Sequence, residues 1–289
     1  MKILICDAFD SSLPEKLVKY GEVFTDKERL AEANIALIRS KTKCTKEWID
    51  SALSLKMIIR GGVGLDNVNC EYAQQKGITV ENTPEASSIA VAEMAFAMMI
   101  AMPSRLIQAH NGMTNEQWLK KQCKRTELYG KTLGVIGYGR IAQELAKRAQ
   151  AFSMNVIAYK RTPAECQYAQ MKTLDEVLST SDFISLHTPL NNASRGIIRN
   201  ETIAKMKSGV YIINTARGEC VVEKDIAAAL DTGKIAGYAA DVWEQEPPQD
   251  WSLAKKEQCL ASPHIASSSA ENLKRIGDVI EQKIAQFTN

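Results

Sequence analysis

The feature that most constrains this chain is a short glycine-rich turn placed between an apolar run and a helical pattern. It reads Gly137-Tyr138-Gly139-Arg140-Ile141-Ala142 and follows the strand-like segment at 132–136. The pattern G-x-G-x-x-A is weak alone and much stronger between a strand and a helix. The first glycine permits a tight bend, and the second lets backbone N–H groups approach an anion at the helix N-terminus. We therefore expect a dinucleotide-binding turn with Gly137, Gly139, Arg140 and Ile141 beside the pyrophosphate.

Strand-like apolar runs alternate with helical patterns along the whole chain. Buried β runs separated by helices build parallel sheets, so the alternation predicts an α/β fold with two Rossmann-like domains. The expected strands are 3–6, 35–38, 57–60, 79–81, 133–136, 156–159, 183–186, 210–214 and 238–242, and the expected helices include 46–53, 141–151, 174–178, 223–230 and 271–287.

The position of the glycine turn predicts the domain organisation. At 289 residues the chain is long enough for two domains. Because the turn lies near the middle, another domain is built first. We expect the first part of a substrate-binding domain at 1–100, the dinucleotide-binding domain at 101–265, and a last helix at 266–289 that returns to the substrate domain. Small ligands usually bind between domains, which favours this return and makes the substrate domain discontinuous.

Composition argues against several classes of protein. The net charge of +2 and the lack of a basic stripe argue against nucleic-acid binding. The methionine-rich apolar segment 89–102 is interrupted by Glu93 and is too short for a bilayer, so we expect a buried helix. Seven scattered cysteines without a C-x-x-C pair indicate reduced thiols and no metal site. With no visible signal peptide, we expect a cytoplasmic protein.

Two cations stand where dinucleotide domains usually carry an acid. A carboxylate about 20 residues beyond the first glycine grips the adenine ribose in NAD-binding domains. Here that region reads Tyr159-Lys160-Arg161-Thr162. No carboxylate repels a 2′-phosphate, and Lys160 and Arg161 could attract one. The sequence therefore leaves NAD or NADP open as the cofactor, and the alternative is that both cations point into water.

Three stretches in the C-terminal half carry chemically useful side chains. They are Thr215-Ala216-Arg217-Gly218-Glu219, the segment from Asp241 to Pro247, and Ser262-Pro263-His264-Ile265, and each follows a strand-like run. A guanidinium binds a carboxylate bidentately, and an imidazole moves a proton near neutral pH. Taken alone, the arginine could equally form a structural ion pair, and the histidine could simply belong to a turn. Together, the groups indicate a site that holds an acid and moves a proton.

The order of these motifs resembles the D-isomer-specific 2-hydroxyacid dehydrogenases over essentially the whole chain. The resemblance rests on the glycine turn, the three stretches above, RGGVGLDNV at 60–68, NTPEASSIAVAE at 82–93, TELYGKTL at 126–133 and LHTPL at 186–190. Each motif is weak alone, and the complete series in order is specific. It implies hydride transfer between a nicotinamide and C2 of a 2-hydroxy or 2-keto acid.

The resemblance also implies roles for individual residues. Arg217 matches the arginine that binds the substrate carboxylate, His264 the acid–base group and Glu246 its carboxylate partner. Asp241 matches a residue that faces the nicotinamide carboxamide. The remaining implied cofactor contacts are His187, Thr188, Pro189, Thr215 and Ala216, and the implied substrate contacts are Arg60, Val63, Gly64 and Ser87.

Substrate, assembly and regulation are further expectations from the resemblance. Arg60 supports 3-phosphoglycerate as substrate, as in serine biosynthesis, with glyoxylate or hydroxypyruvate reduction as the alternative. A non-catalytic NAD-sensing corepressor is a rival from another class. The methionine-rich helix near 88–110 matches a dimer-forming helix, so we expect a homodimer. Because the chain ends after its last helix, we also expect no C-terminal regulatory domain and no feedback control by serine.

Overall fold

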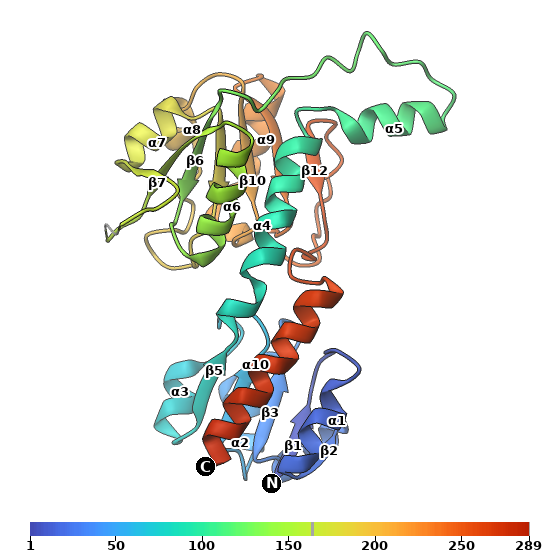
Figure 1. The fold of residues 1–289 in the computed structure, drawn as a ribbon, viewed down its shortest axis with the longest axis vertical. Helices are drawn as coiled ribbons and strands as arrows, with labels where there is room; N and C mark the ends of the chain where they lie inside the picture. The colour runs from blue at the N-terminus through green and yellow to red at the C-terminus, as the bar shows by residue number, and fades with distance from the viewer. Residues whose placement is uncertain (163–164, 289) are drawn as a thin grey trace. The chain divides into compact units, whose positions relative to one another are not determined.

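The chain folds into two α/β units in a computed structural model that describes residues 1–162 and 165–288. Unit 1 comprises Met1–Ala90 and the segment from Ser267 onward, and unit 2 comprises Val91–Ala266 (Figure 1). The first boundary falls at Ala90 within helix α4 (Pro84–Ala101), ten residues before the expected position at 100. The parallel α/β fold class expected from the alternating pattern is confirmed.

Unit 1 is built on a parallel five-stranded sheet in the order β2-β1-β3-β4-β5. The strand order reverses between β1 and β3, and ligands of such sheets bind outside the carboxyl ends of the strands at that point. The strands are β1 (Lys2–Ile5), β2 (Glu22–Phe24), β3 (Ile35–Ile38), β4 (Met57–Arg60) and β5 (Thr79–Asn82). The helices are α1 (Leu13–Leu17), α2 (Lys46–Ser51), α3 (Cys70–Gln75), the start of α4, and α10 (Ala270–Thr288).

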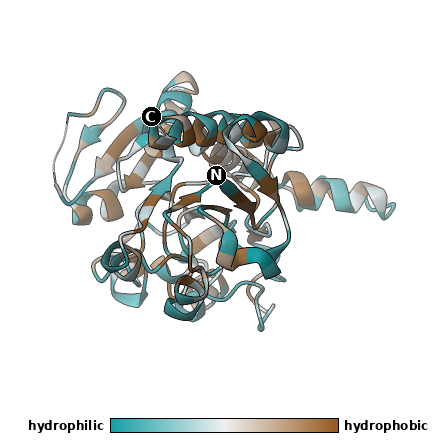
Figure 2. Ribbon diagram, turned by 90° about the horizontal axis from the view of Figure 1, so that it is seen from below, coloured by the Kyte–Doolittle hydropathy of each residue, from teal (hydrophilic) through white to brown (hydrophobic). Residues whose placement is uncertain are grey.

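The C-terminal helix belongs to unit 1. Ile276, Ile280 and Ile284 recur every four residues along α10, and all three are fully buried. This spacing places them on one helix face, which packs against Ile3 and Ile59 of the sheet. In Figure 2 the apolar strands are mostly brown, whereas the amphipathic helices carry both brown and teal residues.

Unit 2 carries a parallel seven-stranded sheet in the order β12-β11-β10-β9-β6-β7-β8. Its order reverses between β6 and β9. The strands are β6 (Thr132–Ile136), β7 (Asn155–Tyr159), β8 (Gln170–Met171), β9 (Phe183–Leu186), β10 (Val210–Asn214), β11 (Ile235–Ala240) and β12 (Cys259–Ala261). The helices are the rest of α4, α5 (Leu106–Thr114), α6 (Arg140–Ala151), α7 (Leu174–Thr180), α8 (Asn200–Lys205) and α9 (Glu223–Asp231).

The methionine-rich helix α4 differs from its sequence-based description. It begins at Pro84, before the apolar segment expected at 89–102, and its 18 residues make it long and apolar enough to cross a membrane by length and composition. One such helix is weak evidence for a membrane span, because core helices of soluble proteins pass the same test. Met98 and Met99 are buried in the core of unit 2 beside Leu133 and Val135.

Candidate active site

The glycine turn lies at the point where the strand order of unit 2 reverses. Gly137 follows β6 with a φ of +92°, in the left-handed region that favours glycine. A Cβ added there would come within 2.7 Å of the His187 carbonyl carbon at the end of β9. Gly139 precedes α6 without a side-chain cap, and open space surrounds the position of its missing Cβ. The first N–H groups of α6 are therefore available to an anion.

A cavity of about 490 Å³ opens beside this turn. Among the expected cofactor residues, it is lined by Gly137, Gly139, Lys160, Arg161, His187, Thr188 and Pro189. Arg199 also lines it, and none of its described lining residues is acidic. Arg140, Ile141, Thr215, Ala216 and Asp241 do not line it. The cavity therefore combines a helix N-terminus with three cationic side chains, a composition suited to a phosphorylated ligand.

Two buried polar side-chain atoms of the expected cofactor residues have no hydrogen-bond partner within the described residues, which bears on whether a polar ligand fits here. The His187 ring pairs with the Ser185 hydroxyl at 2.8 Å through Nε2, while its buried Nδ1 has no hydrogen-bond partner within the described residues. Burial lowers the pKa of His187 to about 4, so the ring is neutral at pH 7. The Thr215 hydroxyl is likewise buried without a described partner. Buried polar atoms normally have partners, and His187 lines the cavity whereas Thr215 does not, so the His187 Nδ1 is the atom that fits a polar ligand such as a dinucleotide.

The Arg217 turn is shaped by a buried asparagine and a glycine. The Asn214 side chain accepts a hydrogen bond from the Ala216 N–H at 3.1 Å and donates one to the Arg217 carbonyl at 2.9 Å. At Gly218, an added Cβ would lie 1.9 Å from the Trp243 carbonyl carbon. The missing side chain therefore lets the Arg217 turn pack directly against the loop that carries Glu246.

His264 and Glu246 form a direct pair. The His264 Nδ1 lies 2.7 Å from the Glu246 Oε2, and the Glu246 Oε1 accepts a hydrogen bond from the Trp243 N–H at 3.2 Å. Burial raises the pKa of Glu246, but the hydrogen bond and charge of His264, together with the charge of Arg217, outweigh it and lower the pKa below its ordinary value. The structure thus brings the predicted imidazole and carboxylate together, with the guanidinium close enough to act on Glu246.

Asp241 is buried and binds protein rather than lining the dinucleotide cavity. Its carboxylate accepts hydrogen bonds from the Ser262 hydroxyl and from the backbone N–H groups of Ile265 and Ala266. These donors lie on either side of His264 in the sequence. Asp241 therefore has a structural role that the sequence did not indicate, and its expected contact with a nicotinamide carboxamide stays a prediction.

The expected substrate residues of unit 1 occupy different environments. Arg60 ends β4, and its guanidinium packs over Gly62, where an added Cβ would lie 2.0 Å from its Nη1. Val63 and Gly64 follow in the exposed or partly exposed turn. Ser87 is fully buried, and its hydroxyl accepts a hydrogen bond from the Asn272 amide at 3.2 Å, so it joins α4 to α10.

Arg39 is a candidate site residue that the sequence interpretation missed. It directly follows β3, next to the point where the strand order of unit 1 reverses, and Ile38 is paired in register with Arg60. Its backbone N–H donates to the Asp7 carboxylate at 2.6 Å, and burial lowers the pKa of its guanidinium. Its buried Nε has no hydrogen-bond partner in the described part of the chain. The signal was available, because an arginine after an apolar strand run was also the signal for Arg217.

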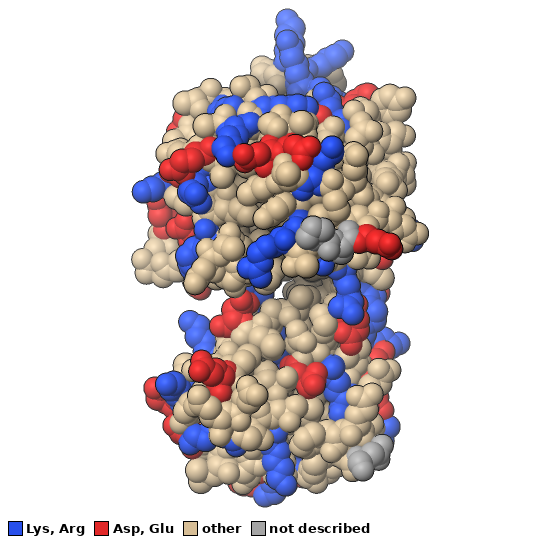
Figure 3. Space-filling model, turned by 90° about the vertical axis from the view of Figure 1, so that its left-hand side faces the viewer, with Lys and Arg blue, Asp and Glu red and all other residues tan. Residues whose placement is uncertain are grey.

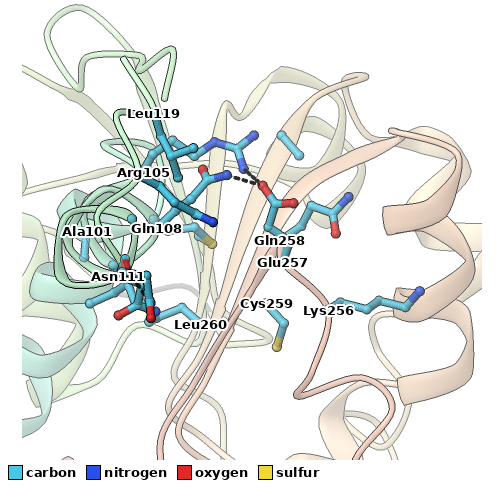
Figure 4. A pocket seen from close by; sticks show the side chains of 16 residues that line it. Ala101, Arg105, Gln108, Asn111, Leu119, Lys256, Glu257, Gln258, Cys259 and Leu260 are labelled. Carbon is cyan, nitrogen blue, oxygen red and sulfur yellow. Dashed lines mark hydrogen bonds and ion pairs between the residues drawn. The ribbon is translucent and has the colours of Figure 1, made fainter. Parts of the chain in front are cut away.

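Two further cavities lie in unit 2. One, of about 430 Å³, is lined by His264 and Glu246 together with Trp243, Trp251 and three prolines. The other, of about 440 Å³, lies between α5 and the β12 edge, where Arg105 and Gln108 both approach Glu257 (Figure 4). No residue expected from the sequence to contact cofactor or substrate lines this second cavity.

Comparisons with known proteins agree with this geometry. Residues 96–266 match the family model described as "D-isomer specific 2-hydroxyacid dehydrogenase, NAD binding domain". The chain is 40% identical to the hydroxypyruvate reductase of Thermotoga maritima, covering 98% of this chain and 97% of that protein. It is also 40% identical to the D-3-phosphoglycerate dehydrogenase of Methanocaldococcus jannaschii, covering 98% of this chain but only 57% of that protein.

A solved structure shows the same fold. The D-lactate dehydrogenase of Aquifex aeolicus, complexed with NAD and lactic acid, superposes with a TM-score of 0.90 at 29% identity and covers 99% of this chain and 95% of that one. The fold and site define a dinucleotide-binding α/β protein with a histidine–carboxylate pair. The chain belongs to the D-isomer-specific 2-hydroxyacid dehydrogenase family, which confirms the resemblance identified from the motifs.

The contact at Gly218 predicts a stability effect. In Gly218→Ala, the added methyl group collides with the backbone of Trp243, so we expect the free energy of unfolding to fall by about 1–3 kcal/mol. Gly139→Ala is the matched control, because no atom lies within 4 Å of its added Cβ. Urea unfolding of both variants measures the difference. Equal stability of the two variants would contradict the close packing of the two loops.

Proposed function

We propose that this protein is an NAD(P)-dependent D-2-hydroxyacid dehydrogenase. A bound nicotinamide dinucleotide would supply or accept the hydride at C2 of the substrate. The chain itself must then hold the acid and move one proton to or from the C2 oxygen. The single observation that carries the proposal is the 2.7 Å contact between the His264 Nδ1 and the Glu246 carboxylate.

His264 is the proposed acid–base residue. The pKa of Glu246 lies below its ordinary value, so this carboxylate is ionised at neutral pH and can only accept a hydrogen bond. The proton in the pair therefore belongs to the His264 Nδ1. Nε2 is left to take a proton from the substrate hydroxyl during oxidation, or to give one to the carbonyl oxygen during reduction. Glu246 also stabilises the imidazolium formed during oxidation.

Arg217 is the proposed anchor for the substrate carboxylate. A guanidinium binds a carboxylate through two parallel hydrogen bonds, which orients as well as attracts it. Packing at Gly218 ties the Arg217 turn to the loop that carries Glu246. An acid held by Arg217 would thus lie within the same loop cluster as the proton-transferring pair.

Replacing His264 tests its proposed role. His264→Ala should lower kcat by about 10²–10⁴-fold, because proton transfer would lose its positioned base. His110→Ala is the matched control, since His110 lies exposed on α5. Steady-state reduction of a 2-keto acid measures both variants. Near-normal turnover by His264→Ala would contradict the role.

For the substrate, we propose 3-phosphoglycerate and its 2-keto product. Arg39 and Arg60 follow or end neighbouring strands of unit 1, so they lie at the same edge of its sheet. Two guanidinium groups at the carboxyl ends of parallel strands suit a dianionic phosphate. Reduction of hydroxypyruvate or glyoxylate is the second candidate. It is favoured by the similarity to the hydroxypyruvate reductase, which this chain covers almost completely.

A substrate panel separates the two candidates. If the phosphorylated acid is the substrate, kcat/KM with phosphohydroxypyruvate should exceed that with hydroxypyruvate by at least about tenfold. That factor corresponds to the free energy of one charge-assisted hydrogen bond. Arg39→Met and Arg60→Met should remove this preference, whereas Arg195→Met, an exposed arginine of unit 2, should retain it. A preference for hydroxypyruvate or glyoxylate would favour the second candidate, and no turnover on any 2-keto acid would reject dehydrogenase activity.

For the cofactor, we propose that NADP is accepted at least as well as NAD. Lys160, Arg161 and Arg199 line the dinucleotide cavity, and no described lining residue is acidic. A 2′-phosphate would find cations there, whereas the carboxylate that usually binds a free 2′-hydroxyl is missing.

A charge reversal tests this cofactor preference. Lys160→Asp should shift the ratio of kcat/KM values from NADPH toward NADH by about 10–100-fold, because a carboxylate repels the 2′-phosphate and binds the free ribose. Lys147→Asp, on the exposed face of α6, provides the same charge change as a control. A wild-type protein with a large preference for NADH, unaltered by Lys160→Asp, would contradict the proposal.

We also propose that two copies of the chain associate through the region around α5. Met98 and Met99 are turned into the core of unit 2, so they are not available to a partner. Helix α5 and the segment after it instead expose Leu106, Ile107, Met113 and Trp118. Lys and Arg side chains project from the end of unit 2 at which Figure 1 draws the segment after α5 (Figure 3). Exposed apolar clusters of this kind mark interaction surfaces.

The oligomeric state tests the proposed interface. Light scattering should give a dimer for the wild-type chain. Ile107→Asp combined with Met113→Asp should give a monomer, because two buried charges would oppose association. Leu53→Asp, on the exposed surface of unit 1, should remain dimeric. A wild-type monomer at micromolar concentration would contradict the interface.

A further inference from the structure

Asp241 is the most completely satisfied carboxylate near the proposed catalytic pair. Only 1% of its surface is exposed. Oδ1 accepts hydrogen bonds from the Ser262 hydroxyl at 2.6 Å and the Ile265 N–H at 2.9 Å, and Oδ2 accepts one from the Ala266 N–H at 2.8 Å. A buried carboxylate is costly unless donors surround it, so these contacts identify a built feature of the fold.

The segment that Asp241 binds holds His264 in an uncommon backbone conformation. The φ of His264 is +54°, in the left-handed region that residues other than glycine rarely occupy. Such a conformation persists only where the surroundings enforce it. Because Asp241 binds Ser262 on one side of His264 and Ile265 and Ala266 on the other, it supplies this enforcement.

The same short stretch of chain also positions Glu246. Asp241 directly follows β11, and two residues later the Trp243 N–H donates to the Glu246 carboxylate. The Trp243 indole donates to the Ser262 carbonyl at 3.1 Å, and the Ser262 N–H donates to the Ala240 carbonyl at 2.9 Å. Hydrogen bonds from the end of β11 and the residues just after it therefore position both the His264 imidazole and its carboxylate partner.

We infer that Asp241 is a positioning residue that holds the His264 backbone so that its imidazole meets Glu246. This inference rests on the proposed function for its kinetic consequences. It differs from the role implied by the family resemblance, in which Asp241 faces the nicotinamide carboxamide. A carboxylate offers about four acceptor positions, and three of them are used within the protein.

Asp241→Asn separates these roles. The amide has nearly the same shape, but it presents an NH₂ group to at least one of the three donors. The Ile265 or Ala266 N–H would lose its partner, and the His264 segment would loosen. We expect kcat to fall by about 10²-fold, the cost of a small misplacement of a catalytic group. The dissociation constant of the reduced cofactor, measured by nicotinamide fluorescence, should change by less than about threefold.

Coupling to Glu246 provides a readout that a general loss of structure would not alter. If Asp241 acts through the pair, Asp241→Asn should lower kcat by less than about threefold in a Glu246→Gln background. Multiplicative losses in the double variant would overturn the inference. A rise in the cofactor dissociation constant as large as the fall in kcat would also overturn it, in favour of the carboxamide contact.

Amide exchange tests the structural claim without reference to turnover. Hydrogen–deuterium exchange followed by mass spectrometry should show faster exchange in Asp241→Asn at peptides that contain residues 262–266, with the rest of unit 2 unchanged. Asp182→Asn is the matched control, because Asp182 accepts a hydrogen bond from the Thr132 N–H at 2.8 Å where β6 begins. Unchanged exchange at 262–266 would overturn the inference.

Failure of the positioning role can be distinguished from failure of the proposed function. If Asp241→Asn does not fold, Ser262→Ala removes one donor and should produce the same local increase in exchange with a smaller loss of kcat. If the wild-type chain reduces no 2-keto acid, the proposed function fails. Faster exchange at 262–266 would then still support the anchoring role, and unchanged exchange would overturn both.

Discussion

The parallel order of the strands in unit 2 is the constraint on which the rest of its site depends. Parallel strands bring their carboxyl ends to one edge of the sheet, so loops that are distant in sequence share that edge. Gly137 follows β6, His187 follows β9, Arg217 lies just beyond β10, and Asp241 follows β11. Side-by-side pairing of these strands therefore accounts for a glycine turn, a guanidinium and a carboxylate in one region.

Close backbone packing and buried hydrogen bonds fix the positions of the loops at this edge of the sheet. Gly218 lets two loops touch, Asn214 shapes the Arg217 turn, and Asp241 holds the segment around His264. The groups proposed to perform chemistry are thus supported by neighbours that need contact neither substrate nor cofactor. Preorganisation of this kind lowers the cost of aligning reacting groups, which is where much of the rate enhancement of enzymes arises.

Most of the secondary structure followed from the sequence, and the misses share a cause. The strands β3, β4, β9 and β10 were predicted with their observed limits because each consists of apolar residues with at most one polar residue. The strands β2 and β8 were missed, and β12 was expected only as a strand-like run before Ser262. These three strands have two or three residues and lie at sheet edges, where few buried apolar residues are needed. The start of β11 was also missed, since Gly237 weakens its apolar pattern.

The sequence by itself determined the fold class and the family, and it predicted roles for Arg217, Glu246 and His264, because apolar periodicity and ordered motifs are properties of the linear chain. Only the tertiary structure showed that the predicted pair of Glu246 and His264 is in contact at 2.7 Å, that Arg39 follows a strand paired with the one that ends at Arg60, and that Ser87 is buried against Asn272. The role of Asp241 was also decided there, since hydrogen bonds between residues more than twenty positions apart depend on strand pairing and loop conformation, which local sequence patterns do not encode.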